Sequence, residues 1–343
     1  MANNRIFYAI QGLGLAPHEV AASGGAPSGF NTAHGVQSVS LNTTFNLEQV
    51  FELGQLELYE NIEGIPAIEL TAQKVLDGYP LLYHLATPVA TSPTLVGRSN
   101  ERCYVALNIY PDTFDNASGT PLQMVGMSGM YVSSLTYTLN IDGNCTEDVT
   151  LVGNDKIWYA SGNGFTPVGF DGTDAPAAAS GVQRREDVIM GTGVSGSIWP
   201  LEIPGIDASG NNPVDGSSFA AHIQTVTIST DLGRDELFEL GRRGPYHRFV
   251  TFPVEVTCAI NITSSEGDLV DAIADPPGGT NLTNQTIKIY MNDGTIFDLG
   301  TKNKLASVTY GGGDAAGGNV AVVLNYSNFN SFTLTAPSDP AGL

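Results

Sequence analysis

The sequence predicts an all-β chain made of two tandem copies of one domain. Residues 36–54 recur without gaps as residues 223–241, an offset of 187 with seven identities in nineteen positions. Conserved pairs include Gln37 with Gln224 and Gly54 with Gly241. The 40 glycines and 19 prolines, together with many Thr, Val, Ser and Asn residues, favour short strands and turns over long helices. An internal repeat constrains the architecture more strongly than any local motif does.

The repeat offset also predicts where the domains lie. A chain of 343 residues is long enough for two domains of ordinary size. We expect the first domain in residues 1–180 and the second in residues 185–343. Residues 161–180 are rich in Gly, Ala, Asp and Pro and form the expected linker.

The strands of the first copy follow from alternating apolar and polar residues. Val39 and Leu41 alternate with Ser38 and Ser40, which predicts a strand over 36–45. The apolar parity of residues 50–62 shifts across Gly54, which predicts one strand with a bulge or kink there. A short helix is expected near Tyr79, with Pro80 in its first turn. Further strands are expected at 67–73, 102–109, 130–141 and 148–152, the last two joined by a turn at Asp142 and Gly143.

The second copy has the same order of elements. A short helical patch is expected at 267–274, and Asp293-Gly294 predicts a hairpin turn. The expected strands are 223–230, 236–240 continuing through 248–250, 254–262, 286–291, 296–299, 305–310, 320–326 and 331–335.

The charge balance excludes several classes of partner. Thirty-five acids against 14 bases give a net charge of −21. Adhesion to phosphate backbones or anionic membranes relies on basic patches, so neither is expected, whereas a surface that repels nucleic acid is compatible. No apolar run reaches the length of a membrane span, and the N-terminal residues lack a signal-peptide pattern, so no membrane anchoring is expected. Cys103, Cys145 and Cys258 predict free thiols in a reducing cytoplasm.

No motif predicts catalysis. The five histidines have no zinc-ligand spacing, and no Gly-x-Ser-x-Gly elbow occurs; the glycines of 126–129 and 193–197 predict flexible turns. Gly12-Leu-Gly14 lacks the context of a dinucleotide loop, and residues 142–148 lack the ligand spacing of an EF-hand. We therefore expect no enzyme, no cofactor and no metal.

The two copies differ in charge immediately after the shared Phe-Glu-Leu-Gly sequence. The first copy continues with acids and the second with bases: Glu57, Glu60 and Glu63 against Arg242, Arg243 and Arg248. Ribbons of opposite sign at equivalent positions suit neighbours that recognise each other in an alternating ring. The alternative is two solvated hairpins whose charges have drifted independently.

Several runs of residues resemble the major tail tube proteins of tailed bacteriophages. They are 36–61 followed by Lys74-Val-Leu-Asp-Gly-Tyr-Pro80, 133–155, 231–243 and 252–256. The resemblance covers most of both copies and rests on strand patterns, with no catalytic motif to carry over. It implies β-sandwich or half-barrel domains with a flanking helix, assembled into stacked rings around a channel that conducts DNA during ejection. Tube subunits of this family typically carry one such domain, so the duplication departs from the pattern.

The resemblance and the duplication together predict the assembly. Three chains, rather than six, would close a ring with pseudo-sixfold symmetry. The lumen is expected to be net negative, so that duplex DNA passes without tight binding. Lumen-facing candidates are Glu48, Glu57, Glu60 and Asp235, and inter-subunit candidates are Arg242, Arg243, Arg248 and Glu63. The protein would belong to the virion tail, contact other tail proteins, and assemble in the cytoplasm of the host bacterium.

An alternative is a two-domain β-sandwich adhesin or carbohydrate-binding fibre protein. Such a module would expose clustered Trp and Tyr side chains for stacking on sugars. The chain has only two tryptophans, Trp158 and Trp199.

Overall fold

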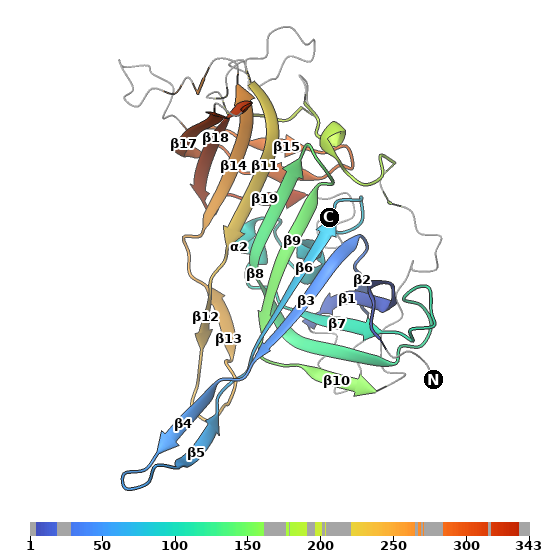
Figure 1. Ribbon diagram of the computed structural model, residues 1–343, viewed down its shortest axis with the longest axis vertical. Helices are drawn as coiled ribbons and strands as arrows, with labels where there is room; N and C mark the ends of the chain where they lie inside the picture. Colours follow the sequence, from blue (N-terminus) through green and yellow to red (C-terminus); the bar gives the residue numbers. More distant parts are fainter. Residues whose placement is uncertain are drawn as a thin grey trace.

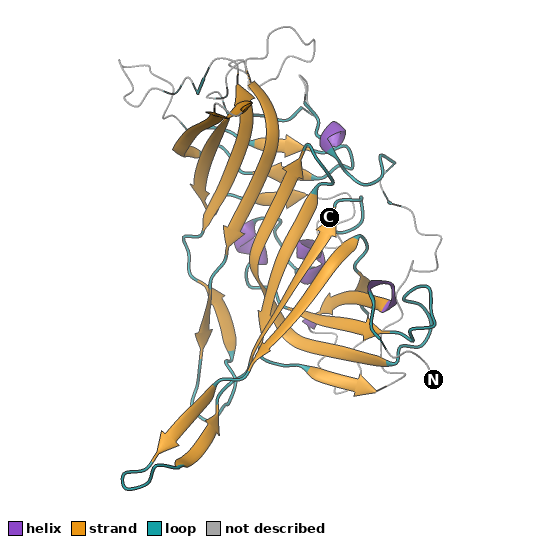
Figure 2. Cartoon of the chain, viewed as in Figure 1, coloured by secondary structure: helices purple, strands orange, loops and turns teal. Residues whose placement is uncertain are grey.

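The computed structural model describes residues 5–18, 29–160, 176–177, 179–190, 196–200, 203, 221–264, 267–268, 270, 284–314 and 317–335. Strands dominate this part of the chain, and the helices are short (Figure 2), so the prediction of an all-β fold is confirmed. The helices are α1 (Leu82–Ala86) and α2 (Leu95–Arg98), with 3-10 turns η1 (Tyr8–Ile10) and η3 (Arg185–Asp187). None of these described helices is long enough to cross a membrane.

Eight antiparallel strands form one continuous sheet that runs through both halves of the chain (Figure 1). The first half supplies four neighbouring strands and the second half the next four. In spatial order they are β3 (Val36–Thr44), β6 (Ala67–Val75), β9 (Thr146–Gly153), β8 (Gln123–Asn140), β11 (Ala221–Asp231), β14 (Glu255–Ser264), β18 (Gly317–Phe329) and β17 (Lys304–Asp314).

The other strands are shorter. The first part of β8 pairs with β7 (Cys103–Ile109) and β10 (Ile157–Ala160), and β7 continues to β1 (Gln11–Pro17) and β2 (Asn31–Thr32). A small sheet contains β15 (Lys288–Tyr290), β16 (Ile296–Asp298) and β19 (Thr333–Thr335). Two hairpins extend from the main sheet toward the bottom of Figure 1: the first hairpin, β4 (Leu47–Phe51) with β5 (Leu58–Glu63), and the second hairpin, β12 (Arg234–Leu237) with β13 (His247–Val250).

The main sheet has one buried and one open face, as side-chain alternation requires. One hydrophobic core lies on the buried face and spans both halves. It joins Leu70 and Ile260 of the main sheet to Leu82 of α1, Val105 of β7 and Phe297 of β16. The two halves therefore fold onto a common core.

The two halves repeat the same strand registers. Four pairs at the base of each hairpin match at an offset of 187, from Leu47 opposite Glu63 and Arg234 opposite Val250 onward. Both β3 and β11 have a bulge at equivalent positions, around Gln37 and Gln224, and each glutamine donates its side-chain amide to the carbonyl two residues earlier.

The correspondence continues through the last two strands of each half, where a second repeat appears. The β8–β9 and β17–β18 ladders have matching bulges, which align Ser134-Leu-Thr-Tyr137 with Ser307-Val-Thr-Tyr310 at an offset of 173. The offset differs from 187 because the segment between β6 and β8 is longer than the segment between β14 and β17.

Three local expectations were wrong. Residues 236–240 do not continue as one strand through 248–250, because β12 and β13 are separate strands that pair antiparallel in the second hairpin. Residues 50–62 are not one kinked strand: Gly54 lies in the turn of the first hairpin with φ +104°, and Gly241 has φ +85° at the same place in the second. Residues 126–129 are not a flexible turn but part of β8. A Cβ on Gly126 would meet the Tyr104 hydroxyl at 2.3 Å, so glycine is required there for packing rather than for a turn.

The structure tests the helix prediction for the first half, whereas the other helix prediction and the linker fall mostly on residues that it does not describe. In the first half, α1 begins at Leu82, just after Pro80, and α2 follows it, so this half has two short helices instead of one. The helical patch at 267–274 and the linker at 161–180 lie mostly outside the described residues.

A buried carboxylate anchors α1 to the sheet. The side chain of Glu147 in β9 is fully buried and accepts hydrogen bonds from the backbone amides of Leu82 (2.6 Å) and Tyr83 (3.1 Å), the first amides of the helix. The Tyr137 hydroxyl donates to the same carboxylate at 2.8 Å. Burial raises the pKa of Glu147, and these three hydrogen bonds partly offset that rise.

This carboxylate predicts a specific pH dependence. Because its pKa is higher in the folded than in the unfolded state, its stabilising contribution is present below the ordinary glutamate pKa of about 4.3 and is lost as pH rises through the folded pKa. We expect Glu147→Gln to remove this loss of folding stability at higher pH. Urea unfolding of both proteins from pH 4 to pH 8 checks this: wild type should lose stability relative to the variant as pH rises, and parallel curves would contradict the assignment.

Candidate assembly interface

The junction between the halves shows how one four-stranded unit joins the next. The second part of β8 pairs with β11 over seven residues. Across it, Tyr137 lies opposite Ile228, and both side chains are buried, at 0% and 1% exposure. The full register is Thr225–Asn140, Val226–Leu139, Thr227–Thr138, Ile228–Tyr137, Ser229–Thr136, Thr230–Leu135 and Asp231–Ser134.

Tyr137 reaches beyond its own half. Its ring lies 5.0 Å from the ring of Phe297 and 6.1 Å from that of Phe332, both in the second half. These tilted aromatic contacts add packing energy to the strand pairing. The junction therefore combines backbone hydrogen bonds with an aromatic side chain that the next unit covers.

The two edge strands of the main sheet correspond to the two strands that meet at this junction. At one end, β3 pairs with β6 and corresponds to β11; at the other, β17 pairs with β18 and corresponds to β8. Tyr310, the counterpart of Tyr137, is 57% exposed, and Leu41, the counterpart of Ile228, is partly exposed. The same residue types are covered inside the chain and uncovered at its edges. Exposed strand edges with apolar side chains are surfaces that promote pairing with another chain.

Both hairpins expose apolar side chains to solvent. Leu53 and Leu56 in the first turn and Leu240 in the second are fully exposed. Further exposed apolar residues are Phe45, Leu47, Phe51, Leu58, Tyr59 and Ile62 of the first hairpin and its base, and Leu237, Phe238, Tyr246, Phe249 and Phe252 of the second. A concentration of exposed apolar groups of this size marks a contact surface.

The predicted acidic candidates lie on these projecting hairpins rather than on the main sheet. Glu48 is in β4, Glu57 in the first turn, and Glu60 in β5, all exposed. Asp235 is exposed in β12 and accepts a hydrogen bond from Thr251. The direction in which these four side chains face within an assembly stays a prediction.

The predicted basic candidates have three different environments. Arg242 is 3.4 Å from Glu239 of its own turn, and Arg248 pairs with Glu236 and also donates to Asn154 of the first half. The guanidinium of Arg248 is largely buried, and burial lowers its pKa.

Arg243 joins the two hairpins. It lies 3.6 Å from the Glu63 carboxylate and donates to the backbone carbonyls of Glu63 and Gly64 at 3.4 and 3.3 Å. The structure therefore brings together one predicted base and one predicted acid from different halves of the same chain. Because both side chains are mostly exposed, the pair contributes orientation more than stability.

The open face of the main sheet is lined with hydroxyl and amide side chains. Its charged residues within the described strands are four acids and a single base, Lys304, at the start of β17. The acids are Glu69, Asp148, Asp231 and Glu255. The other polar residues of this face include Ser38, Ser40, Asn42, Thr44, Thr71, Gln73, Ser134, Thr136, Thr138, Asn140, Thr146, Thr150, His222, Thr225, Thr227, Ser229, Thr257, Asn261, Thr263, Ser307, Thr309, Asn319, Asn325 and Ser327.

Sequence reasoning missed this face and the exposed tyrosine at the sheet edge, Tyr310. The alternation of β3 placed Ser38 and Ser40 opposite Val39 and Leu41 but could not show that eight strands align their polar residues on one surface. The Ser-x-Thr-Tyr match between β8 and β17 was the available signal for Tyr310.

The remaining candidates have structural positions. Trp199 is buried, and Trp158 is 52% exposed. All three cysteines are free and buried, as predicted, and burial raises the pKa of each thiol to about 12.

No family model and no curated protein matches the sequence. Several solved structures have a weak likeness to this chain, among them these three. One is the anti-feeding prophage cap, described as the AFP tube terminating cap: 12% identity, 47% of this chain and 94% of that chain, TM-score 0.33. The second is from the PVC sheath-tube complex of an extracellular contractile injection system in its extended state. The identity is 13%, the match covers 46% of this chain and 93% of that chain, and the TM-score is 0.33. The third is from the sixfold-symmetrised anti-feeding prophage baseplate. The identity is 10%, the match covers 47% of this chain and 98% of that chain, and the TM-score is 0.34.

Proposed function

We propose that this chain is a structural subunit of a phage tail tube, and that three chains close one ring. The observation that carries the proposal is the match between the free edges and the internal junction. If β17 of one chain pairs with β3 of the next as β8 pairs with β11, Tyr310 meets Leu41 as Tyr137 meets Ile228. The uncovered edge residues then become buried.

The registers support a tandem duplication behind this geometry. Each half supplies four strands with the same order, the same bulges and the same hairpin register. Repeating one rotation between successive units closes a ring. Six units, from three chains, give a barrel of 24 strands in which no sheet edge remains.

The open face of the main sheet is the proposed lumen. Serine, threonine and asparagine side chains are neutral, and the four carboxylates repel phosphates. Binding to a DNA backbone requires neutralising lysines or arginines, which this face nearly lacks. Duplex DNA would therefore pass through the channel during ejection without tight binding.

The exposed hairpins extend from the main sheet and provide further contacts (Figure 1). Their apolar side chains suit neighbouring chains, stacked rings or other tail proteins. This role needs no cofactor and no catalytic residue, and it places the protein in the virion tail after assembly in the cytoplasm of the host bacterium.

Electron microscopy of the purified protein, combined with native mass spectrometry, tests the proposal. We expect rings of three chains that stack into tubes as concentration rises. Monomers at all concentrations would contradict it. Discrete trimers that never stack would also contradict it and would favour the fibre-protein alternative.

A further inference from the structure

The tip of the second hairpin contacts the base of the first and forms part of the wall of a cavity there. Arg243 and Gly244 line this cavity of about 520 Å³ together with base residues of the first half. Those residues include Phe45, Asn46, Leu47, Glu63, Gly64 and Pro66. Inside the chain, the hairpin tip of one unit therefore rests on the hairpin base of the unit before it.

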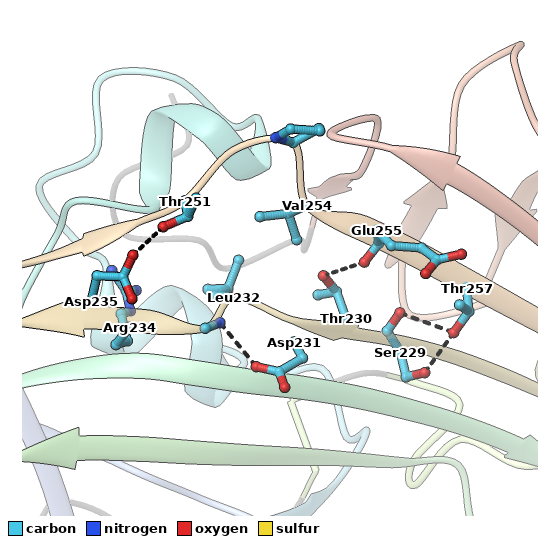
Figure 3. Close-up of a pocket in the computed structure, with 12 residues that line it drawn as sticks. Ser229, Thr230, Asp231, Leu232, Arg234, Asp235, Thr251, Val254, Glu255 and Thr257 are labelled. Carbon is cyan, nitrogen blue, oxygen red and sulfur yellow. Dashed lines mark hydrogen bonds between the residues drawn. The ribbon is translucent and has the colours of Figure 1, made fainter.

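The second half has a cavity at the base of its own hairpin that shares part of this lining (Figure 3). Its volume is about 530 Å³. Five of its lining residues are counterparts, at the offset of 187, of residues that line the first cavity: Leu232, Gly233, Arg234, Thr251 and Pro253 correspond to Phe45, Asn46, Leu47, Gly64 and Pro66. No hairpin tip lines this second cavity within the described part of the chain.

We propose that the tip of the first hairpin of the next chain, residues 53–57, occupies this second cavity. The inference rests on the proposed ring, because it needs a following chain. Leu56 is the counterpart of Arg243, and Glu57 of Gly244, because the hairpins share their register up to Val50–Glu60 and Leu237–His247, with nine residues beyond that pair in each. Leu56 is fully exposed in the single chain.

The chemistry of the cavity suits an apolar side chain at its centre. Leu232 and Val254, both buried, point toward each other between the strands that enter and leave the second hairpin (Figure 3). The guanidinium of Arg234 donates hydrogen bonds to the backbone carbonyls of Val132 and Ser99. Leucine cannot reproduce the hydrogen bonds of Arg243, so Leu56 would bind by burial of apolar surface.

The rim of the cavity differs in charge from its counterpart. Asp231, Asp235 and Glu255 surround it, and the incoming hairpin carries Glu57 in its tip and Glu52 directly before the tip. The contact inside the chain pairs opposite charges, Arg243 and Glu63, whereas the contact between chains brings like charges together. Salt screens such repulsion, so the contact between chains strengthens as ionic strength rises.

Thiol cross-linking tests the contact directly. Leu56→Cys with Thr251→Cys places one thiol on the tip and one on the cavity rim, both at exposed positions. The native cysteines are buried with raised pKa values, so a bismaleimide reacts with the new thiols. In assembled rings we expect links between chains, in a ladder that ends at three chains. The matched control, Arg243→Cys with Glu63→Cys, should link within one chain and leave the mass on a denaturing gel unchanged.

A second pair separates this inference from the ring itself. Leu41→Cys with Tyr310→Cys reports the strand edges. If that pair links chains and the tip pair does not, the tip inference is wrong and the ring stands. If micrographs show no rings and neither pair links chains, both are wrong.

Substitutions at Leu56 provide an independent readout. Leu56→Arg adds a donor for the carbonyls of the rim and an opposite charge, and should strengthen ring formation by up to about fivefold, the upper range for an exposed ion pair. Leu56→Glu should weaken it, most strongly at low salt. Equal ring formation in both variants would overturn the inference.

Discussion

Tyr310→Asp is expected to abolish ring formation while leaving the single chain folded. Tyr310 is 57% exposed in the isolated chain, so an aspartate there is solvated and the fold tolerates it. In the proposed ring, the same side chain would be buried beside Leu41 of the next chain, as Tyr137 is buried beside Ile228. Leaving a charge buried without a partner costs about 3–5 kcal/mol. That is roughly a hundredfold or more in the association constant at every junction.

Sedimentation velocity measures whether rings form, and circular dichroism measures whether the single chain stays folded. The matched control is Thr309→Asp, one residue earlier on β17, whose side chain lies on the open face of the sheet. We expect this control to form rings as wild type does. Normal ring formation by Tyr310→Asp would show that β17 is not the edge at which chains meet.

Lysines on the open face of the sheet are expected to convert a passive channel into one that retains DNA. Glu69 in β6 and Thr257 in β14 occupy equivalent positions in the two halves, both on this face. Glu69→Lys with Thr257→Lys adds six lysines to each ring of three chains. Each phosphate that a lysine neutralises steepens the dependence of log affinity on log salt by about 0.9. Binding should therefore be strong at low salt and fall steeply as salt increases.

Filter binding of duplex DNA to assembled tubes checks this expectation. Asp115→Lys with Thr113→Lys makes the same change in net charge on the loop between β7 and β8 and serves as the control. We expect the control tubes and wild-type tubes to retain little DNA. Equal retention by both lysine variants would place the DNA path elsewhere.

The fold class and most strands could be predicted because their signals are local. Alternation along residues 36–45 and 67–73 gave β3 and β6, and Asp293-Gly294 gave the turn between β15 and β16. The path of β8 was missed in part because Gly126 and Gly129 were interpreted as turn residues. Gly126 is required for packing, since Tyr104 occupies the space that a side chain there would need, whereas Gly129 has φ +62° within the strand.

The candidate interface was only partly predictable for a physical reason. The sequence shows the charge and the repeat position of each residue. These two properties identified Arg243 and Glu63 as candidates, and the structure brings them together. Whether a strand lies at an edge depends on pairings between residues far apart in the chain. Tyr137 and Tyr310 share a local sequence, yet one is buried and the other exposed, because only the first has a following unit in the same chain.

A cryo-electron microscopy reconstruction of the assembled ring tests the central claim most directly. We predict three chains in one ring, with β17 of each chain antiparallel to β3 of the next and Tyr310 opposite Leu41. A ring of six chains, or a ring in which these two strands do not pair, would contradict the account.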